Sequence, residues 1–378
     1  MNILFLDQYS DLGGAQQCLL DLLPAIQAAG WNAACAVPGQ GPLVERIRAH
    51  GVAAYDLPAA LLHAGTKPPQ DFLRFALQSP KLASRISHLA RDSRADLLYV
   101  NGPRVLPAAA WAAHRAGLPL LFHCHNHLSQ RSAAVLVGRS LRFSNARVIA
   151  CCQNVARPLW PYVDTTDIRV VYNGVAPAPA SHRTASEGPR IGLIGRISPE
   201  KGQLEFVQAA RLVLQQHPRA QFIVYGAPLF ADPVAASYCE RVRNAAQGLP
   251  VDFPGWEDNV NAALATLDLL VVPSLREGGA PRVILEAYAG RVPVVAFVSG
   301  GIPEILHDGE TGFLVEPPTP EALARKLTEL LREPGELCNV ADGSYAIWAE
   351  QFTVARYQRE VLAVIGLTQT RSATGVSI

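Results

Sequence analysis

The sequence has no long apolar segment and no paired-cysteine motif. No window reaches the roughly 18 consecutive apolar residues that a transmembrane helix needs, so we expect none. The seven cysteines form no C-x-x-C pair and several stand in apolar runs, which predicts reduced, mostly buried thiols in a cytoplasmic protein. The first residues carry no basic stretch, and Asp7 comes too early in the chain for a signal peptide.

Net charge and glycine spacing argue against two further classes. The formal net charge of +1 gives no reason to expect a nucleic-acid partner. No strand-like run leads into G-x-G-x-x-G, which disfavours a nicotinamide-dependent oxidoreductase. What is present is an ordinary globular composition, 49% hydrophobic and 17% charged, in a chain of 378 residues that is long enough for two domains.

Short apolar runs alternate with longer helical patterns along the whole chain. This alternation predicts an α/β fold with two Rossmann-like, doubly wound parallel sheets and crossover helices. Residues 174–189, rich in Pro, Ala and Ser, are predicted to link a domain over 1–173 to a domain over 190–345. We expect ligands in a cleft at the carboxyl ends of the strands. The predicted strands cover 3–6, 33–37, 97–100, 120–123, 148–151, 191–194, 221–224, 251–253, 269–272, 294–296 and 312–315.

The most informative stretch is a strand, a glycine-bearing loop and an apolar helix over 269–289. Such a loop offers backbone N–H groups and the positive end of a helix dipole, which suit a phosphate or another anion. It also carries two carboxylates, Glu277 before the helix and Glu286 inside it. Glu286 stands among apolar residues and needs donors, either Arg282 one turn back or the hydroxyls of a ligand. A tight turn with a Glu–Arg pair on a helix is the simpler interpretation.

The stretch reads EGGAPRVILEAYAGRVPVVA and is followed by GGIPE and GETGFLV. Together these motifs resemble the donor-binding half of the retaining glycosyltransferases of family 4, which have the two-domain GT-B fold. The resemblance implies that two Rossmann-like domains face a cleft and that a last helix, over 346–366, crosses back to the N-terminal domain. It implies transfer of a hexosyl group from a nucleotide sugar to an acceptor hydroxyl in polysaccharide or glycolipid assembly. A UDP-sugar is favoured as donor, GDP-mannose comes next, and no metal or cofactor is expected.

The resemblance also assigns roles within the loop. Glu286 would bind the ribose hydroxyls, and the amides of Arg282 and Val283 would contact the phosphate. The two glutamates of the family signature are separated by seven residues, whereas eight separate Glu277 from Glu286 here. Either the loop bulges to bring Glu277 to the sugar hydroxyls, or the backbone after it takes over that contact. The backbone residues concerned are Gly278, Gly279, Ala280 and Pro281.

A second motif, GRISPEKG, follows a predicted strand over 195–202. Arg196 and Lys201 can both reach a diphosphate, one as a planar fork and one as a point charge. Taken singly, such side chains are usually just solvated. The motif resembles the Gly-Arg…Lys-Gly segment of the family, which implies that both cations stabilise the leaving nucleoside diphosphate without a metal. Glu257 lies where the relatives hold the base of the nucleotide.

The N-terminal half contributes a glycine turn and a histidine motif. Gly13-Gly14 connect the first predicted strand to a helix, and the resemblance implies that they face the donor diphosphate. His123, His125 and His127 alternate, so an extended segment places them on one face, where a metal site and a structural role are both open interpretations. The resemblance places His125 at the donor sugar, with His123 as the alternative. The predicted catalytic groups are therefore His125, Glu277, Lys201 and Arg196.

Two basic stretches, over 81–94 and 131–147, are interpreted first as solvated helix faces. Relatives that glycosylate lipids dock such surfaces on anionic membranes, so peripheral contact with the inner face of the membrane is a second expectation. The acceptor is left open among saccharides, lipid-linked sugars and small molecules, and the oligomeric state is left open too. Two alternative functions fit the same resemblance: a non-catalytic protein that binds a nucleotide sugar, and a sugar-nucleotide epimerase.

Overall fold

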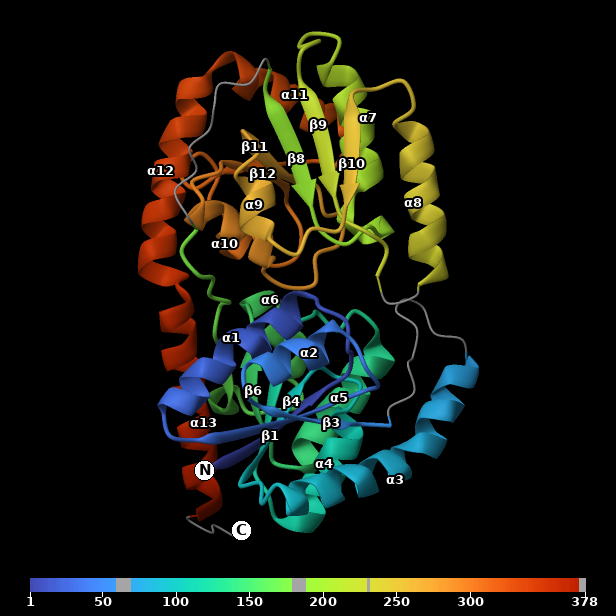
Figure 1. Cartoon of the computed structure of the whole chain (residues 1–378), viewed down its shortest axis with the longest axis vertical. Coiled ribbons are helices and arrows are strands. Elements are labelled where there is room, and N and C mark those ends of the chain that lie inside the picture. Colours follow the sequence, from blue (N-terminus) through green and yellow to red (C-terminus); the bar gives the residue numbers. More distant parts are fainter. Residues whose placement is uncertain (59–68, 179–187, 230–231, 374–378) are drawn as a thin grey trace. The chain divides into compact units, whose positions relative to one another are not determined.

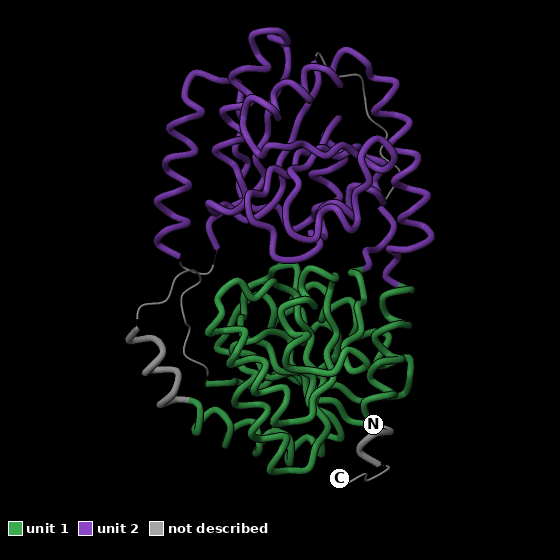
Figure 2. The backbone as a smooth tube through the Cα atoms, turned by 180° about the vertical axis from the view of Figure 1, so that it is seen from behind, with its two compact units in different colours: residues 1–173, 355–378 green, residues 174–354 purple. Residues whose placement is uncertain are grey.

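A computed structural model describes residues 1–58, 69–178, 188–229 and 232–373 of the chain. The chain divides into two compact units, which are coloured separately in Figure 2. Unit 1 comprises Met1–Asn173 and Ala355–Ile378, and unit 2 comprises Gly174–Val354. Of the predicted linker 174–189, residues 179–187 lie outside the described residues. In the described part of the chain, no helix has the length and apolar character needed to cross a membrane.

Unit 1 is built on a parallel sheet of seven strands (Figure 1). The strands are β1 (Asn2–Asp7), β2 (Asn32–Val37), β3 (Ala53–Asp56), β4 (Leu97–Asn101), β5 (Leu120–Cys124), β6 (Arg147–Ala150) and β7 (Ile168–Val170). Their order in the sheet is β3-β2-β1-β4-β5-β6-β7. The central strands β4 and β5 are buried along their whole length, as expected for a parallel sheet that is covered on both faces.

The helices of unit 1 form two groups, one on each face of this sheet (Figure 1). One group consists of α1 (Gly14–Ala28) and α2 (Pro42–Ala49), and the other of α3 (Pro69–Asp92), α4 (Leu106–Ala116) and α5 (Arg131–Phe143). The short α6 (Gln153–Ala156) follows β6. Helix α1 shows why these segments form helices here: Leu19, Leu22, Leu23 and Ile26 recur at spacings of three and four and are all buried in the core.

Unit 2 has a parallel sheet of six strands in the order β10-β9-β8-β11-β12-β13. The strands are β8 (Arg190–Ile194), β9 (Gln221–Tyr225), β10 (Val251–Gly255), β11 (Leu269–Val272), β12 (Val294–Phe297) and β13 (Phe313–Val315). Helices α7 (Gln203–Val213), α8 (Pro233–Ala245) and α11 (Pro320–Arg332) form one group. Helices α9 (Val260–Leu264), α10 (Arg282–Ala289) and α12 (Pro334–Gln351) form the other. The predicted class, a doubly wound α/β fold in both halves, is confirmed.

The prediction of one continuous helix over 346–366 is wrong. The structure has two helices there, α12 in unit 2 and α13 (Val354–Ala373), of which Ala355 onward belongs to unit 1. The break occurs because the backbone around Thr353 pairs with Val175. The Val175 N–H donates to the Phe352 carbonyl over 2.9 Å, and the Val354 N–H donates to the Val175 carbonyl over 3.1 Å. The carbonyl at 352 therefore accepts from outside the helix, and α12 ends here.

Candidate functional site

In unit 2 the two segments with most of the predicted site residues follow neighbouring strands. Strands β8 and β11 lie side by side, and the sheet continues from them in opposite directions, to β9 and to β12. This is a topological switch point, where doubly wound sheets bind ligands outside the carboxyl ends of their strands. We call residues 195–202, after β8, the cation loop, and residues 273–281, after β11, the glutamate loop.

The backbones of these two loops are joined. The Leu275 N–H donates to the Glu200 carbonyl over 2.9 Å. Gly202 ends the cation loop with φ +72°, and a Cβ atom there would lie 1.9 Å from the carbonyl oxygen of Pro273. Only glycine allows both this backbone conformation and this close approach. The positions of the two loops are therefore coupled.

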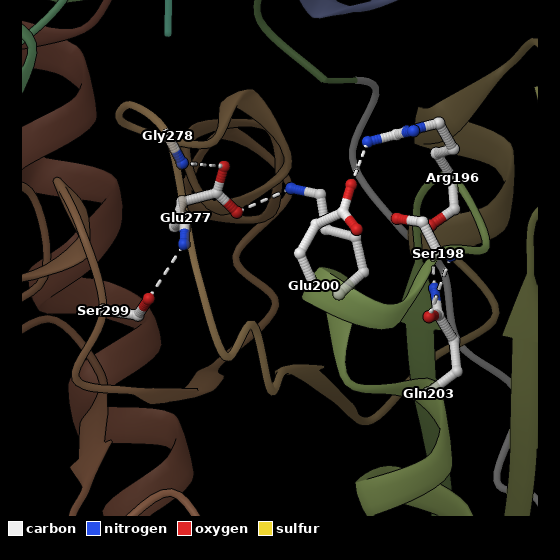
Figure 3. Close-up of polar contacts among 8 residues, drawn as sticks. Arg196, Ser198, Glu200, Gln203, Glu277, Gly278 and Ser299 are labelled. Carbon is white, nitrogen blue, oxygen red and sulfur yellow. Dashed lines mark hydrogen bonds and ion pairs between the residues drawn. The ribbon is translucent and has the colours of Figure 1, made fainter. Parts of the chain in front are cut away.

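Each predicted cation of the cation loop contacts a carboxylate, as Figure 3 shows for Arg196 and Glu200. The Lys201 Nζ atom lies 2.6 Å from Glu277 Oε2, an ion pair that joins the cation loop to the glutamate loop. The side chains of Arg196 and Lys201 are 22% and 27% exposed, so an anion can reach both, whereas that of Glu277 is 10% exposed. Burial raises the pKa of the Glu200 carboxyl, but the Arg196 guanidinium and hydrogen bonds to the carboxylate outweigh burial, and this pKa lies below its usual value.

The turn after β12 fixes the position of Glu277 (Figure 3). The Glu277 N–H donates to Ser299 Oγ over 2.8 Å, and the Gly278 N–H donates to the Glu277 carboxylate over 3.2 Å. Gly300 has φ +55°, and a Cβ atom there would lie 2.1 Å from the Glu277 carbonyl oxygen. In this longer loop the Glu277 carboxylate therefore lies between Lys201 and the Gly278 amide. Contact of either the carboxylate or the backbone with a sugar stays a prediction.

The rest of the glutamate loop leads into the start of α10. Pro281 is the N-cap residue and has no side-chain oxygen, and the first turn contains no acidic residue. The N–H groups of the first turn, with those of Arg282 and Val283 among them, form the positive end of the helix dipole, where an anion is favoured. Before them, Gly279 and Ala280 are buried and Gly278 is half-buried.

Glu286 has a hydrogen-bond donor within the protein itself. The Arg282 Nε atom lies 3.5 Å from Glu286 Oε1, and the two side chains are only 10% and 17% exposed. Arg282 also donates from Nη1 to the Gly174 carbonyl over 3.0 Å. Of the two sources of donors expected for Glu286, the arginine one turn back is thus present, and a ribose contact stays a prediction.

Glu257 lies apart from these contacts. It follows β10, the edge strand, which is two strands away from β8 in the sheet. Its Oε1 accepts the Asn259 N–H over 2.8 Å and so helps to organise the start of α9. A role of the backbone near Glu257 in holding a nucleotide base stays a prediction.

Unit 1 has a second switch point, between β1 and β4. Asp7 ends β1 and accepts from Asn101 Nδ2 over 2.6 Å and from Gln16 Nε2 over 2.9 Å. The Asn101 Oδ1 atom lies 2.7 Å from His125 Nε2. Because Asn101 donates through Nδ2, its Oδ1 accepts, and the His125 proton is on Nε2. Burial raises the pKa of Asp7 above its usual value, and the hydrogen bonds that it accepts offset this only in part.

The three alternating histidines have three different partners. His123 is 1% exposed, and its Nδ1 lies 2.7 Å from the Tyr99 hydroxyl, while its ring packs on that of His125 with centroids 3.9 Å apart. His127 is exposed, and its Nδ1 lies 2.8 Å from the Asn154 carbonyl oxygen. In the described parts of the chain, no group of three or more His, Cys, Asp or Glu side chains is arranged to hold a metal ion. Of the predicted pair, His125 is half-buried and is the one that a ligand can reach.

The predicted glycine pair lies at the start of α1. Gly13 is the N-cap residue in extended conformation, and Gly14 is the first helical residue. No side chain caps this end, and the first turn has no acidic residue. The local geometry thus suits an anion, although contact with a diphosphate stays a prediction.

Five polar residues of these two clusters did not emerge from the sequence as site residues. They are Asp7, Asn101, Glu200, Gln203 and Ser299. Asp7 and Asn101 end buried strands and Ser299 follows one, a pattern that could have identified them. The spacing of four residues from Arg196 could have indicated Glu200. Gln203 donates to the Arg196 carbonyl over 2.8 Å, a contact without a sequence signal.

Two family models match the chain, one in each half. The model of the glycosyl transferases group 1 matches residues 188–333, which include the cation loop and the glutamate loop. The model of glycosyltransferase family 4 matches residues 12–178, which include the glycine pair and the three histidines.

Individual proteins are similar to the chain as well. The phosphatidyl-myo-inositol mannosyltransferase of Mycobacterium leprae is 25% identical over 338 residues, which are 85% of this chain and 84% of that protein. The exopolysaccharide phosphotransferase SCO2592 of Streptomyces coelicolor is 30% identical over 188 residues, 45% of this chain but only 19% of that protein. The crystal structure of Anabaena Alr3699/HepE in complex with UDP has a TM-score of 0.80 at 24% identity and covers 97% of this chain and 100% of its own, which shows a shared fold.

Proposed function

The chain belongs to the group 1, family 4 glycosyltransferases with the GT-B fold, and from this we propose its reaction. It transfers a hexosyl group from a nucleoside-diphosphate sugar to an acceptor hydroxyl, with retention of configuration and without a metal ion. The reaction serves polysaccharide or glycolipid assembly. UDP-sugars are the favoured donors because the similar Anabaena structure contains UDP. GDP-mannose comes next because the Mycobacterium leprae relative is named a mannosyltransferase.

The observation that carries this proposal is the meeting of the cation loop and the glutamate loop at the switch point of unit 2. Two accessible cations, Arg196 and Lys201, lie on the cation loop, which is bonded to the glutamate loop that leads into the uncapped start of α10. Together they offer fixed positive charge to an anion of diphosphate size. Such charge acts most strongly where negative charge develops, on the diphosphate oxygen that leaves the sugar.

The proposed chemistry breaks the bond between the anomeric carbon and the diphosphate oxygen and forms a bond from that carbon to the acceptor oxygen on the same face. The acceptor proton passes to a diphosphate oxygen, so the products are a glycoside and a nucleoside diphosphate. Arg196 and Lys201 stabilise the leaving group, and Glu277 or the amides after it hold the sugar hydroxyls. Glu286 binds the ribose, and His125 hydrogen-bonds the donor sugar.

The first experiment identifies the nucleotide. Thermal unfolding is measured with UDP, GDP and ADP, since a ligand that binds only the folded state raises the melting temperature. We expect the largest rise with UDP. Transfer from the matching sugar nucleotide is then assayed with a panel of acceptors, with and without a chelator, and the anomeric configuration of the product is read by NMR. If none of the three nucleotides raised the melting temperature, the proposal would fail.

The second experiment tests the site residues. Lys201→Ala and Glu286→Ala should each lower the transfer efficiency, kcat/KM, by about 100-fold, because each removes a charged contact to the donor. Lys326→Ala is the matched control for Lys201, since Lys326 pairs with Glu329 on α11. Nucleotide binding without any transfer would point instead to a non-catalytic binding protein. Unchanged transfer in both variants would refute the site assignment.

Peripheral membrane contact through the exposed face of α5 is part of the same proposal. Arg131, Arg139 and Arg142 are exposed on this helix, together with Phe143, whereas Arg147 lies 3.5 Å from Asp167 in an ion pair. Cations beside an aromatic side chain suit an anionic bilayer surface. Sedimentation with vesicles that contain anionic lipid should be weakened by Arg139→Gln with Arg142→Gln. Equal sedimentation with neutral vesicles would exclude the electrostatic contact.

A further inference from the structure

The two cations at the switch point are already compensated by two anions. The Arg196 guanidinium contacts the Glu200 carboxylate, and Lys201 Nζ lies 2.6 Å from Glu277 Oε2. Two positive and two negative side chains leave this group with little net charge. A nucleoside diphosphate therefore meets a site whose attraction is reduced by the two carboxylates, and it must compete with them for the cations.

The two carboxylates differ in what else they do. Glu277 is 10% exposed and is held by the Gly278 amide as well as by Lys201, and the proposed function gives it a sugar contact. Glu200 has no such contact assigned. Its side chain is 33% exposed, and its carboxylate contacts the guanidinium of Arg196.

The backbone keeps the Glu200 carboxylate in this position. The Glu200 carbonyl accepts the Leu275 N–H over 2.9 Å and the Arg276 N–H over 3.3 Å, so the backbone of this residue is tied to the glutamate loop. Arg196 is fixed too, because its carbonyl accepts from Gln203 Nε2 over 2.8 Å. Both backbones are held at this point, which keeps the carboxylate and the guanidinium within reach of each other.

We propose that Glu200 is a positioning residue that acts through Arg196 as its counter-ion and weakens the binding of the nucleoside diphosphate, so that this product leaves after transfer. The proposal rests on the proposed function. A diphosphate bound at Arg196 lies close to a second negative charge, and the repulsion between the two favours release. Without Glu200 the cations would hold the product longer, and release would limit turnover.

The test replaces the carboxylate by an amide of the same shape. Glu200→Gln should bind UDP about three- to tenfold more tightly by calorimetry, because one like charge near the diphosphate is removed. In steady-state transfer from a UDP-sugar, kcat and the donor KM should both fall, while UDP inhibits at lower concentration. Glu200→Asp keeps the charge and should restore UDP affinity toward that of the wild type.

Glu329→Gln is the control for net charge. Glu329 pairs with Lys326 on α11 in the same unit, and its loss removes the same charge without touching the cation loop. It should leave UDP affinity and kcat unchanged. Melting temperatures of all variants without ligand verify that they are folded.

The outcomes separate this inference from the proposed function. Equal or weaker UDP binding by folded Glu200→Gln would overturn the inference, since Glu200 would then have no effect on UDP binding or would orient Arg196 for it. The proposed function would still stand. Tighter UDP binding by both Glu200→Gln and Glu329→Gln would assign the effect to the net charge of the protein, and the inference about Glu200 would be overturned as well. A wild-type protein that bound none of UDP, GDP and ADP would overturn both proposals.

Discussion

His123 and His125 are two residues apart, but their surroundings differ. His125 is half-buried and bonded to Asn101, whereas His123 is 1% exposed. Tyr99 contacts its Nδ1, the rings of His125 and Tyr357 pack beside it, and its Nε2 has no hydrogen-bond partner among the described residues. Burial, followed by the charge of His125, lowers the pKa of His123 well below 6.5. The folded protein therefore holds this ring neutral.

This burial makes the stability of unit 1 depend on pH. An unfolded chain takes up a proton on His123 near pH 6.5, which the folded chain does not. Below that pH the unfolded state binds more protons, so the free energy of unfolding falls by up to about 1.4 kcal/mol per pH unit. Hydrogen-exchange protection of the β5 amides between pH 5 and 7.5 measures this slope. His123→Gln should have a flatter slope than the wild type.

The comparison with His123→Gln also separates the effect of Asp7. Its folded pKa is raised above 3.8, so between these two values the folded state binds more protons, and this contribution to stability falls as pH rises. Since Asp7 is present in both proteins, its contribution cancels in the difference. Equal slopes for wild type and variant would show that His123 does not cause the dependence.

At the scale of single residues, the sequence indicated the charged motif positions and Arg282 as a partner of Glu286, but not the partner of Lys201. Arg196, Lys201 and Glu277 could be identified because they stand in recognisable motifs at strand ends. The pairing of Lys201 with Glu277 could not be predicted, because it joins residues 76 positions apart and depends on β8 lying beside β11. Sequence spacing carries no information on such contacts.

At the scale of secondary-structure elements, burial decides what can be predicted. The eleven strands that the sequence predicts occur in the structure, and most of them form apolar runs. The two missed strands, β3 and β7, are the two edges of the sheet of unit 1, and each has at least one exposed residue. Asp56 ends β3 and Arg169 interrupts β7, so neither strand shows a continuous apolar run that would identify it.

Gly300, in the turn after β12, provides a test at the scale of secondary-structure elements. Gly300→Ala adds a Cβ atom 2.1 Å from the Glu277 carbonyl oxygen at φ +55°, so the turn must move and Glu277 with it. We expect a loss of about 2 kcal/mol or more in the free energy of unfolding, together with a raised donor KM. Urea denaturation and donor kinetics measure the two effects.

Gly309→Ala is the matched control for Gly300→Ala. Gly309 has φ +74°, but a Cβ atom there meets nothing within 4 Å. It should cost only the backbone strain of a left-handed residue, about 1 kcal/mol, and leave the donor KM unchanged. If the two variants lost the same stability, close contact with Glu277 would not be what requires glycine at Gly300.

At the scale of the whole molecule, the chain leaves unit 1 after Asn173 and returns to it at Ala355. Helix α13 supplies Tyr357, Val361 and Ile365, all fully buried in the core cluster of unit 1. It also donates from the Tyr357 hydroxyl to the Cys18 carbonyl over 3.2 Å and from Gln358 Nε2 to the Asp21 carbonyl over 2.6 Å. Helix α13 thus completes the core of unit 1.

Truncation after Val354 should therefore destabilise unit 1 and leave unit 2 folded. Each large apolar side chain of α13 contributes about 1.5–3 kcal/mol by burial, so losing three of them removes much of the roughly 5–15 kcal/mol that stabilises a domain. Unit 2 is continuous from Gly174 to Val354 and has its own core cluster. Differential scanning calorimetry should show a lower transition for unit 1, and hydrogen exchange should assign that transition to β1 and β4.

A point variant distinguishes lost packing from mere shortening of the chain. Tyr357→Ala removes a fully buried ring and should cost about 3–5 kcal/mol in unit 1, whereas Arg359→Ala, exposed on the same helix, should cost less than about 0.5 kcal/mol. UDP binding, which the proposed function places in unit 2, should persist in both variants at temperatures where unit 2 is folded. Loss of UDP binding in Tyr357→Ala would mean that unit 2 does not hold the nucleotide independently, because the substitution lies in unit 1.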